Sequence, residues 1–176
     1  IPVGKVARIN VTGPKDYNGT VVVEVDGVKY YINMTKGAGH VDVAKLTNGT
    51  YHVNATLLEN DKYESSYNDT VSFNVYKLNT TVTIEVANIT YGGVAQIVIT
   101  VGDVSLGNVT VTVNDTTKVL PLLNGKAYWN LSDLAAGNYT ITAEVAENDY
   151  YTAAENSTAF TVYKHASEIE SIVVTP

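Results

Sequence analysis

The sequence predicts an all-β protein, and three observations lead to this prediction. Valine, isoleucine and threonine number 27, 10 and 22 among the 176 residues, so about a third of the chain is β-branched, which favours strands over helices. Apolar and polar residues alternate over short stretches that end in turn residues, as they do in half-buried strands. The chain also aligns with itself at a shift of 88 residues, so the same set of strands is expected twice.

The internal repeat is recognised from segments that match at this shift. The matched segments are residues 4–7 with 92–95, 49–51 with 137–139, 59–63 with 147–151 and, after a one-residue slip, 73–77 with 160–164. Because these anchors are spread along the whole length of each copy, the chain is read as two tandem copies of one domain.

Each copy is predicted to form short strands of period two. Val21, Val23 and Val25 alternate with polar residues, and the same alternation recurs at 109–113, so one face of this strand is expected to point inward. Asp26-Gly27 and Asn114-Asp115 follow as hairpin turns, because these residues tolerate positive φ.

Further strands are expected around residues 7–11, 30–34, 41–43, 51–57 and 73–75, around their counterparts in the second copy, and at 79–86. Seven short strands in about 88 residues predict an immunoglobulin-like β-sandwich.

A tyrosine near the start of one strand supports the sandwich over a barrel. In both copies a leucine is followed by a glycine and then, two residues later, by Tyr51 or Tyr139. This is the spacing of a tyrosine corner, in which the phenol bonds to the backbone just upstream. Tyr51 and Tyr139 are therefore predicted to be structural, the alternative being ordinary core aromatics.

Longer segments resemble a known family. These are LNGKAYWNLSDLAAGNYTITAEVAENDYY and STAFTVYK in the second copy, with NGTYHVNATLLENDKY and VSFNVYK in the first. They resemble the bacterial Ig-like (Big) domain repeats of adhesin-like cell-surface proteins, and are most similar to archaeal, particularly methanogen, repeat arrays. The resemblance implies an extracellular stalk or adhesion role without catalytic residues. The usual Gly-Asp before the last strand is replaced by Asn60-Asp61 and Asn148-Asp149.

The repeat is out of phase with the predicted domains. The strand expected at 82–86 has its counterpart at 169–174. We therefore predict a first sandwich at 1–77 that lacks its own first strand, a second sandwich at 78–164, and a spare strand at 165–176. Ile169, Ile172 and Val174 are its apolar residues.

Two sources of the missing first strand remain open. Residues 166–175 could complete the first domain of a neighbouring copy, giving a head-to-tail filament by donor-strand complementation. Alternatively, the next repeat of a longer covalent array supplies the strand. The partners expected are accordingly copies of the chain itself or neighbouring repeats, and the short junction at Lys77-Leu78 predicts a semi-rigid rod.

Asparagine is unusually abundant for a chain of strands. Of 17 asparagines, 13 lie in Asn-x-Ser/Thr, where random placement would give about three. The candidate N-glycosylation sites are Asn10, Asn18, Asn33, Asn48, Asn54, Asn68, Asn79, Asn88, Asn108, Asn114, Asn130, Asn138 and Asn156. We predict that several carry N-glycans on an extracellular, cell-surface or filament protein.

Composition argues against most catalytic chemistry. There is no cysteine, and His40, His52 and His165 neither recur nor share metal-ligand spacing. The charge is −7 with 11 basic residues, so nucleic acid is not expected as a partner. No apolar run approaches the roughly 20 residues of a membrane span. We expect no enzyme activity, catalytic residue or cofactor.

Calcium is the one ion that the loops leave open. The recurring Asn-Asp pairs at 60–61 and 148–149, with Asp16 and Asp103, could supply oxygen ligands, although turn formation explains them equally well. The alternative to a structural role is an adhesin module that binds a host or cell-wall carbohydrate. Its candidate stacking residues are Tyr17, Tyr30, Tyr31, Tyr150 and Tyr151.

Overall fold

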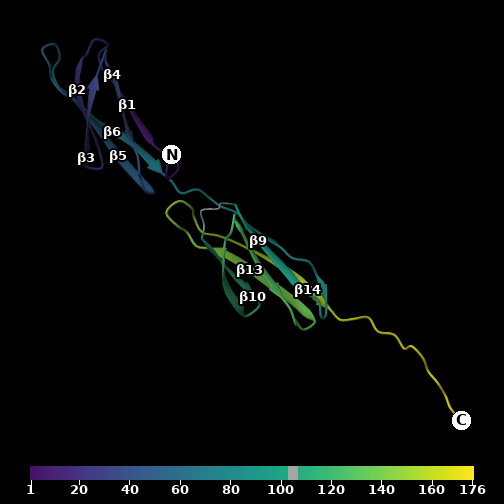
Figure 1. The fold of residues 1–176 in the computed structure, drawn as a ribbon. Coiled ribbons are helices and arrows are strands. Elements are labelled where there is room, and N and C mark those ends of the chain that lie inside the picture. The colour runs from purple at the N-terminus through teal and green to yellow at the C-terminus, as the bar shows by residue number, and fades with distance from the viewer. Residues whose placement is uncertain (103–106) are drawn as a thin grey trace. The chain divides into compact units, whose positions relative to one another are not determined.

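The structure is a computed structural model that describes residues 1–102 and 107–176. The chain divides into two units, Ile1–Leu78 and Asn79–Pro176, each described here by itself. The described residues form strands, turns and loops (Figure 1), which confirms the predicted all-β class. Within the described ranges there is no helix long and apolar enough to cross a membrane. Asp103 lies outside the described residues.

The first unit consists of two antiparallel sheets. Its strands are β1 (Ala7–Thr12), β2 (Gly19–Val25), β3 (Val28–Met34), β4 (Ala38–Val43), β5 (Gly49–Leu57) and β6 (Ser66–Val75). One sheet has the order β3-β2-β5-β6, and the other contains β1 and β4. Val21, Val23 and Val25 of β2 are buried, as their period-two spacing predicts, and pack with Ala7 of β1 and Val43 of β4. The two sheets thus enclose one core.

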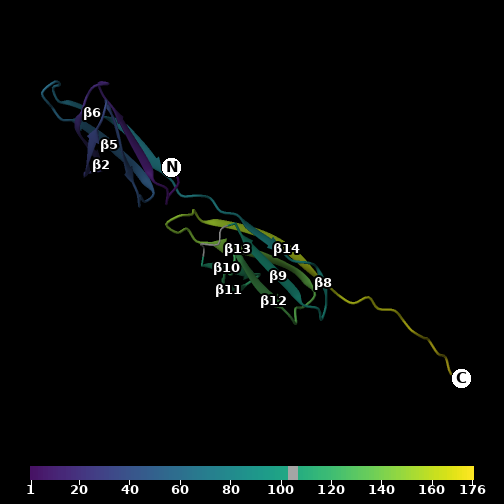
Figure 2. The ribbon, with the colours of Figure 1, turned by 45° about the horizontal axis from the view of Figure 1, so that its top comes forward.

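The second unit repeats this arrangement with additional strands (Figure 2). They are β7 (Val82–Glu85), β8 (Ile89–Thr90), β9 (Ala95–Val101), β10 (Asn108–Val113), β11 (Thr116–Pro121), β12 (Lys126–Leu131), β13 (Gly137–Val145) and β14 (Ala154–Tyr163). One sheet has the order β11-β10-β13-β14-β8, and the other β12-β9-β7. Ile97 and Ile99 of β9 are fully buried against Val109 and Val111 of β10 and Phe160 of β14.

A short parallel pairing was not predicted from the sequence. Ile89 and Thr90 of β8 pair with Val162 and Tyr163 of β14. In the first unit Pro2 forms an equivalent bridge to Tyr76. Two residues are too few to produce an alternating pattern, so this pairing has no periodic signal in the sequence.

Both predicted hairpin turns form, and each also contacts a third strand. Asp26 and Asn114 have φ of 45° and 49°, values at which Asp and Asn are tolerated. Oδ1 of Asp26 accepts a hydrogen bond from the backbone N–H of His52 at 2.8 Å. Oδ1 of Asn114 accepts one from Thr140 at 3.0 Å. The turn residue therefore ties each hairpin to the neighbouring strand, β5 or β13.

The two predicted corner tyrosines make the same backbone contact. The Tyr51 hydroxyl donates to the Thr47 carbonyl at 3.0 Å, and the Tyr139 hydroxyl donates to the Ala135 carbonyl at 2.8 Å. Tyr51 stacks on Phe73, and Tyr139 stacks on Phe160, with ring planes 16° apart in both pairs. Each tyrosine therefore links the loop before its strand to the last strand of the same unit.

We expect Tyr139→Phe to destabilise the second unit by about 1 kcal/mol, because one hydrogen bond to a backbone carbonyl is lost while the ring stack remains. The single tryptophan, Trp129, lies in this unit, so urea unfolding followed by its fluorescence reports the second unit alone. Tyr128→Phe, at an exposed position, is the matched control and should leave the midpoint unchanged. Equal midpoints for the two variants would contradict a structural role for the Tyr139 hydroxyl.

Candidate functional site

The most informative difference between the units is at one edge of the smaller sheet. In the second unit, β7 pairs with β9 in antiparallel register, with Val82 opposite Val101 and Ile84 opposite Ile99. Val82 is buried, and Ile84 and Val86 pack against the core. β7 also contacts β13 and β14 of the other sheet. The first strand therefore closes this side of the second sandwich.

A side-chain hydrogen bond holds β7 across the two sheets. Nδ2 of Asn156, on β14, donates to the carbonyl oxygen of Val82 at 2.8 Å in a partly buried position. Because β7 and β14 belong to different sheets, this bond joins the layers at the edge where the backbone pairs with only one neighbour.

In the first unit the same edge is open. β1 corresponds to β9 and pairs with β4 on one side; within residues 1–102 and 107–176, no strand pairs with its other side. Ile9 and Val11 of β1 are only half-buried, whereas their counterparts Ile97 and Ile99 are 0% exposed. The missing strand thus leaves both backbone groups and core side chains uncovered.

The open edge is hollowed. Two depressions of about 260 and 230 Å³ lie between β1 and the strands β5 and β6. Both are lined by Val11, Thr12, Ala55 and Asn68. Since β7 contacts the counterparts of β5 and β6 in the second unit, the two depressions together, here called the open groove, occupy the place of a first strand.

The continuation of the first strand is nevertheless present in the first unit. The Val3 N–H donates to the Tyr76 carbonyl at 2.8 Å, and the Tyr76 N–H donates to the Ile1 carbonyl at 3.0 Å. These bonds are the counterpart of the pairing between β8 and β14 in the second unit. A strand in the open groove that follows the path of β7 would therefore end beside Ile1.

The predicted spare strand is exposed. Residues 165–176, at the yellow end of Figure 1, form no strand. Ile172 and Val174 are 81% and 89% exposed, and Ile169 is similarly exposed.

One end of the open groove is held by a polar cluster that the sequence did not reveal. Asp16 accepts hydrogen bonds from Lys62 and from the Tyr63 hydroxyl. The hydrogen bond from Lys62, followed by that from Tyr63, lowers the pKa of the Asp16 carboxyl below its usual value. Tyr63 also lines the larger depression. The cluster therefore joins the loop after β1 to the loop after β5.

Of the five tyrosines predicted to stack on a sugar, Tyr17 is not available for this contact. Tyr17 is 0% exposed, and its hydroxyl lies 3.0 and 2.7 Å from the carbonyl oxygens of Thr20 and Leu58. Tyr30 and Tyr151 are half-buried, whereas Tyr31 and Tyr150 are exposed. Tyr17 therefore belongs to the core of the first unit, and its face is closed to a ligand.

In the two Asn-Asp loops, the asparagine side chain stabilises the turn. Oδ1 of Asn60 accepts from the backbone N–H groups of Lys62 and Tyr63, and Oδ1 of Asn148 accepts from those of Tyr150 and Tyr151. These are turn-forming bonds. In the described part of the chain, no three His, Asp or Glu residues are grouped so as to hold a metal ion.

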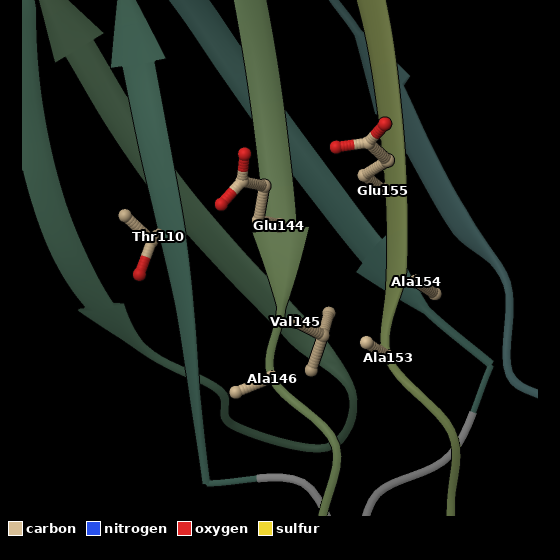
Figure 3. A pocket seen from close by; sticks show the side chains of 7 residues that line it. All are labelled: Thr110, Glu144, Val145, Ala146, Ala153, Ala154 and Glu155. Carbon is tan, nitrogen blue, oxygen red and sulfur yellow. The ribbon is translucent and has the colours of Figure 1, made fainter.

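A depression of about 360 Å³ lies in the second unit (Figure 3). Thr110, Glu144 and Glu155 come from three neighbouring strands, with alanines and Val145 completing the lining. Glu144 and Glu155 stand directly opposite each other, and like charges in this arrangement destabilise a strand pair. We assign no chemistry to these two carboxylates.

The predicted glycosylation sites are mostly accessible. Twelve of the thirteen asparagines are exposed, and Asn54 is half-buried. Some of their amide nitrogens are already engaged. In addition to the Asn156 bond, Nδ2 of Asn88 donates to the Tyr163 hydroxyl, and Nδ2 of Asn18 donates to the Asp16 carbonyl, both at 3.4 Å. Exposure alone therefore does not decide which of these asparagines can carry a glycan.

Comparison with known proteins gives fold similarity only. No family model and no curated protein matches the chain. Among solved structures, the chain is similar to the fibronectin(III)-like modules of Clostridium thermocellum CbhA, with 14% identity over 96% of this chain and 93% of that one and a TM-score of 0.40.

Two further solved structures are similar. A putative membrane-anchored protein from Corynebacterium diphtheriae shares 15% identity over 97% of this chain and 53% of that one, with a TM-score of 0.40. The amphioxus IgVJ-C2 molecule shares 13% identity over 93% and 98% of the two chains, with a TM-score of 0.39. These values do not assign the chain to a family or a function.

We expect the cluster at the end of the groove to stabilise the first unit only while Asp16 is ionised. Its pKa is lowered in the folded state, so this contribution is present above the pKa of the unfolded chain, about 4. It is lost as the pH falls through the lower, folded value. The effect is small because the pair is exposed to solvent.

Thermal unfolding of wild type, Asp16→Asn, Lys62→Met and the double variant at pH 7 and pH 2 tests this expectation. At pH 7 both single variants should be less stable than wild type, and the double variant should lose no more than either. At pH 2 the difference between wild type and Asp16→Asn should shrink. A difference that is the same at both pH values would show that the Asp16 carboxylate is not the source.

Proposed function

We propose that this chain is a non-enzymatic module of an extracellular stalk or filament, in which residues 166–175 of one copy fill the open groove of the next. The observation that carries the proposal is the contrast between the two units: the same edge is closed by β7 in one and open in the other. An edge strand with free N–H and C=O groups beside an apolar groove is suited to strand addition.

The register of β7 indicates how the incoming strand lies. At the 88-residue shift, Ile172 corresponds to Ile84 and Val174 to Val86. Since Ile84 lies opposite Ile99, Ile172 would lie opposite Val11 of β1. Val174 would then cover Ile9. Ile172 and Val174, the two most exposed aliphatic residues of the spare segment, would thus lie opposite the two half-buried core residues of β1.

Ile169 fits the other end of the groove. It corresponds to Val82 when the count is made from Lys164, which aligns with Lys77 after the one-residue slip. Ile169 and Ile172 can both face the core if the incoming strand carries one extra residue between them, as a β-bulge does. The three predicted donor residues would then take the three positions that Val82, Ile84 and Val86 hold in the second unit.

Head-to-tail addition gives a continuous chain of units. Pro176 corresponds to Asn88, and Ile1 to Ile89, so the end of the donor segment would lie next to the beginning of the acceptor. Each junction would then reproduce the connection between β7 and β8. An acidic chain with exposed glycans would resist unwanted pairing at other edges.

Removal of residues 166–176 tests the proposal. We expect the full chain to form head-to-tail oligomers, measured by light scattering and electron microscopy at increasing concentration, and the shortened chain to remain a monomer. A synthetic peptide of residues 166–176 should bind the shortened chain and protect the β1 amides from hydrogen exchange. The matched peptide with Ile172→Asp and Val174→Asp should not bind, because it would bury two charges.

Two outcomes would count against strand donation between copies. If the shortened chain forms the same oligomers as the full chain, the segment is not the link. If the peptide binds but the full chain is monomeric at all concentrations, the strand comes from a neighbouring repeat of one polypeptide. Carbohydrate arrays probed with the full chain test the adhesin alternative, for which Tyr30, Tyr31, Tyr150 and Tyr151 remain the candidate stacking residues.

We also expect native material to carry N-glycans at exposed, outward-facing positions such as Asn33 and Asn130. Asn156 should be unmodified, because its Nδ2 donates to the Val82 carbonyl. Intact-mass measurement of the native protein and peptide mapping after deglycosylation give the occupancy of each site. A native mass equal to that of the bare polypeptide would end the glycosylation hypothesis, and full occupancy at Asn156 would contradict the ranking.

A further inference from the structure

The open groove contains a counterpart of the asparagine that holds β7. Asn68 pairs with Ala55 across β6 and β5, as Asn156 pairs with Ala143 across β14 and β13. The two asparagines are also 88 residues apart. They therefore occupy the same position in the two units.

Asn68 also has a hydrogen-bond donor available for the contact that Asn156 makes with the first strand. Its Oδ1 accepts from the backbone N–H of Thr70 at 3.0 Å and from the Thr70 hydroxyl at 2.9 Å. Within the described residues its Nδ2 donates to no acceptor, although Asn68 lines both depressions. In the second unit the equivalent nitrogen is satisfied by the first strand.

The same nitrogen is the predicted glycan acceptor of a sequon. Asn68-Asp69-Thr70 is an N-glycosylation sequence. In that modification a bond forms between Nδ2 and the anomeric carbon of a lipid-linked sugar. The bond from that carbon to the phosphate leaving group breaks, and Nδ2 releases one proton. Because Asn68 lines both depressions, a glycan on its Nδ2 would compete for space with a strand in the groove, and it would leave that nitrogen with one N–H in place of two.

We propose that Asn68 is the positioning residue for the incoming strand and that glycosylation of Asn68 and strand binding exclude each other. This inference rests on the proposed function. Glycosylation of this one sequon would then regulate assembly. A copy that is glycosylated at Asn68 has a blocked groove and ends a filament, whereas an unmodified copy accepts the next strand. The glycan then sets the number of copies that can join.

The first test uses unglycosylated protein and the peptide of residues 166–176. In the chain shortened to residues 1–165, Asn68→Asp keeps the Oδ1 bond to Thr70 but removes the Nδ2 donor. We expect the dissociation constant to rise about tenfold, as for a lost hydrogen bond. Asn10→Asp adds the same charge at another residue that lines the groove and should change the dissociation constant by less than about twofold.

Asn156→Asp separates positioning from general stability. It should lower the urea midpoint reported by Trp129, because the bond to Val82 is lost, without changing the affinity for the peptide. The urea midpoint of the first unit should be the same for Asn68→Asp and wild type, because the empty groove contains no acceptor for Nδ2.

The second test uses protein from a host that performs N-glycosylation. The fraction that carries a glycan at Asn68 should not bind the peptide, whereas the wild-type chain from a host without N-glycosylation should bind it. Equal affinity of glycosylated and unmodified chains, or of Asn68→Asp and Asn10→Asp, would overturn this inference and leave strand donation standing. Absence of peptide binding to the unmodified wild type would instead overturn the proposed function.

Discussion

The rest of this structure depends on one requirement: the backbone and core side chains at the edge of the smaller sheet must be covered by a strand, as β7 covers them in the second unit. In the second unit β7 pairs with β9, buries Ile97 and Ile99, and receives a hydrogen bond from Asn156 of the other sheet. One strand therefore satisfies backbone groups, covers core side chains and joins the two layers. In the first unit the same edge has none of these contacts among the described residues, and a groove remains between β1 and the strands β5 and β6.

Side chains that bond to the backbone explain why two copies of low overall similarity keep the same architecture. Asp26 and Asn114 fix the hairpins, Asn60 and Asn148 fix the loops before the last strands, and the corner tyrosines fix the entry to β5 and β13. Each bond needs one particular side chain at one position, whereas core positions accept any aliphatic residue of suitable size. Asparagine is thus abundant partly because the fold uses it, independently of glycosylation.

The candidate site was only partly predictable from the sequence. The alternation at Ile9 and Val11, together with the match between residues 169–174 and the strand at 82–86, predicted the open edge and the segment that is proposed to fill it. The position of Asn68 in the groove and the burial of Tyr17 were not predictable. Asn68 has the signature of a glycan acceptor, and Tyr17 that of an exposed loop aromatic. The Tyr17 hydroxyl bonds to the carbonyl of Leu58, 41 positions away. The comparison that draws attention to Asn68 comes from Asn156, whose Nδ2 bonds to Val82, 74 positions away.

The sequence by itself determined the strand class, the repeat and its phase, because periodicity and turn residues are local properties of the chain. Tertiary structure alone decided which amide nitrogens are engaged, and that Asp16, Lys62 and Tyr63 meet at one end of the groove. These features depend on the pairing of strands that are distant in sequence. The pairing fixes where a side chain lies relative to the other sheet, whereas alternation within one strand does not specify this position.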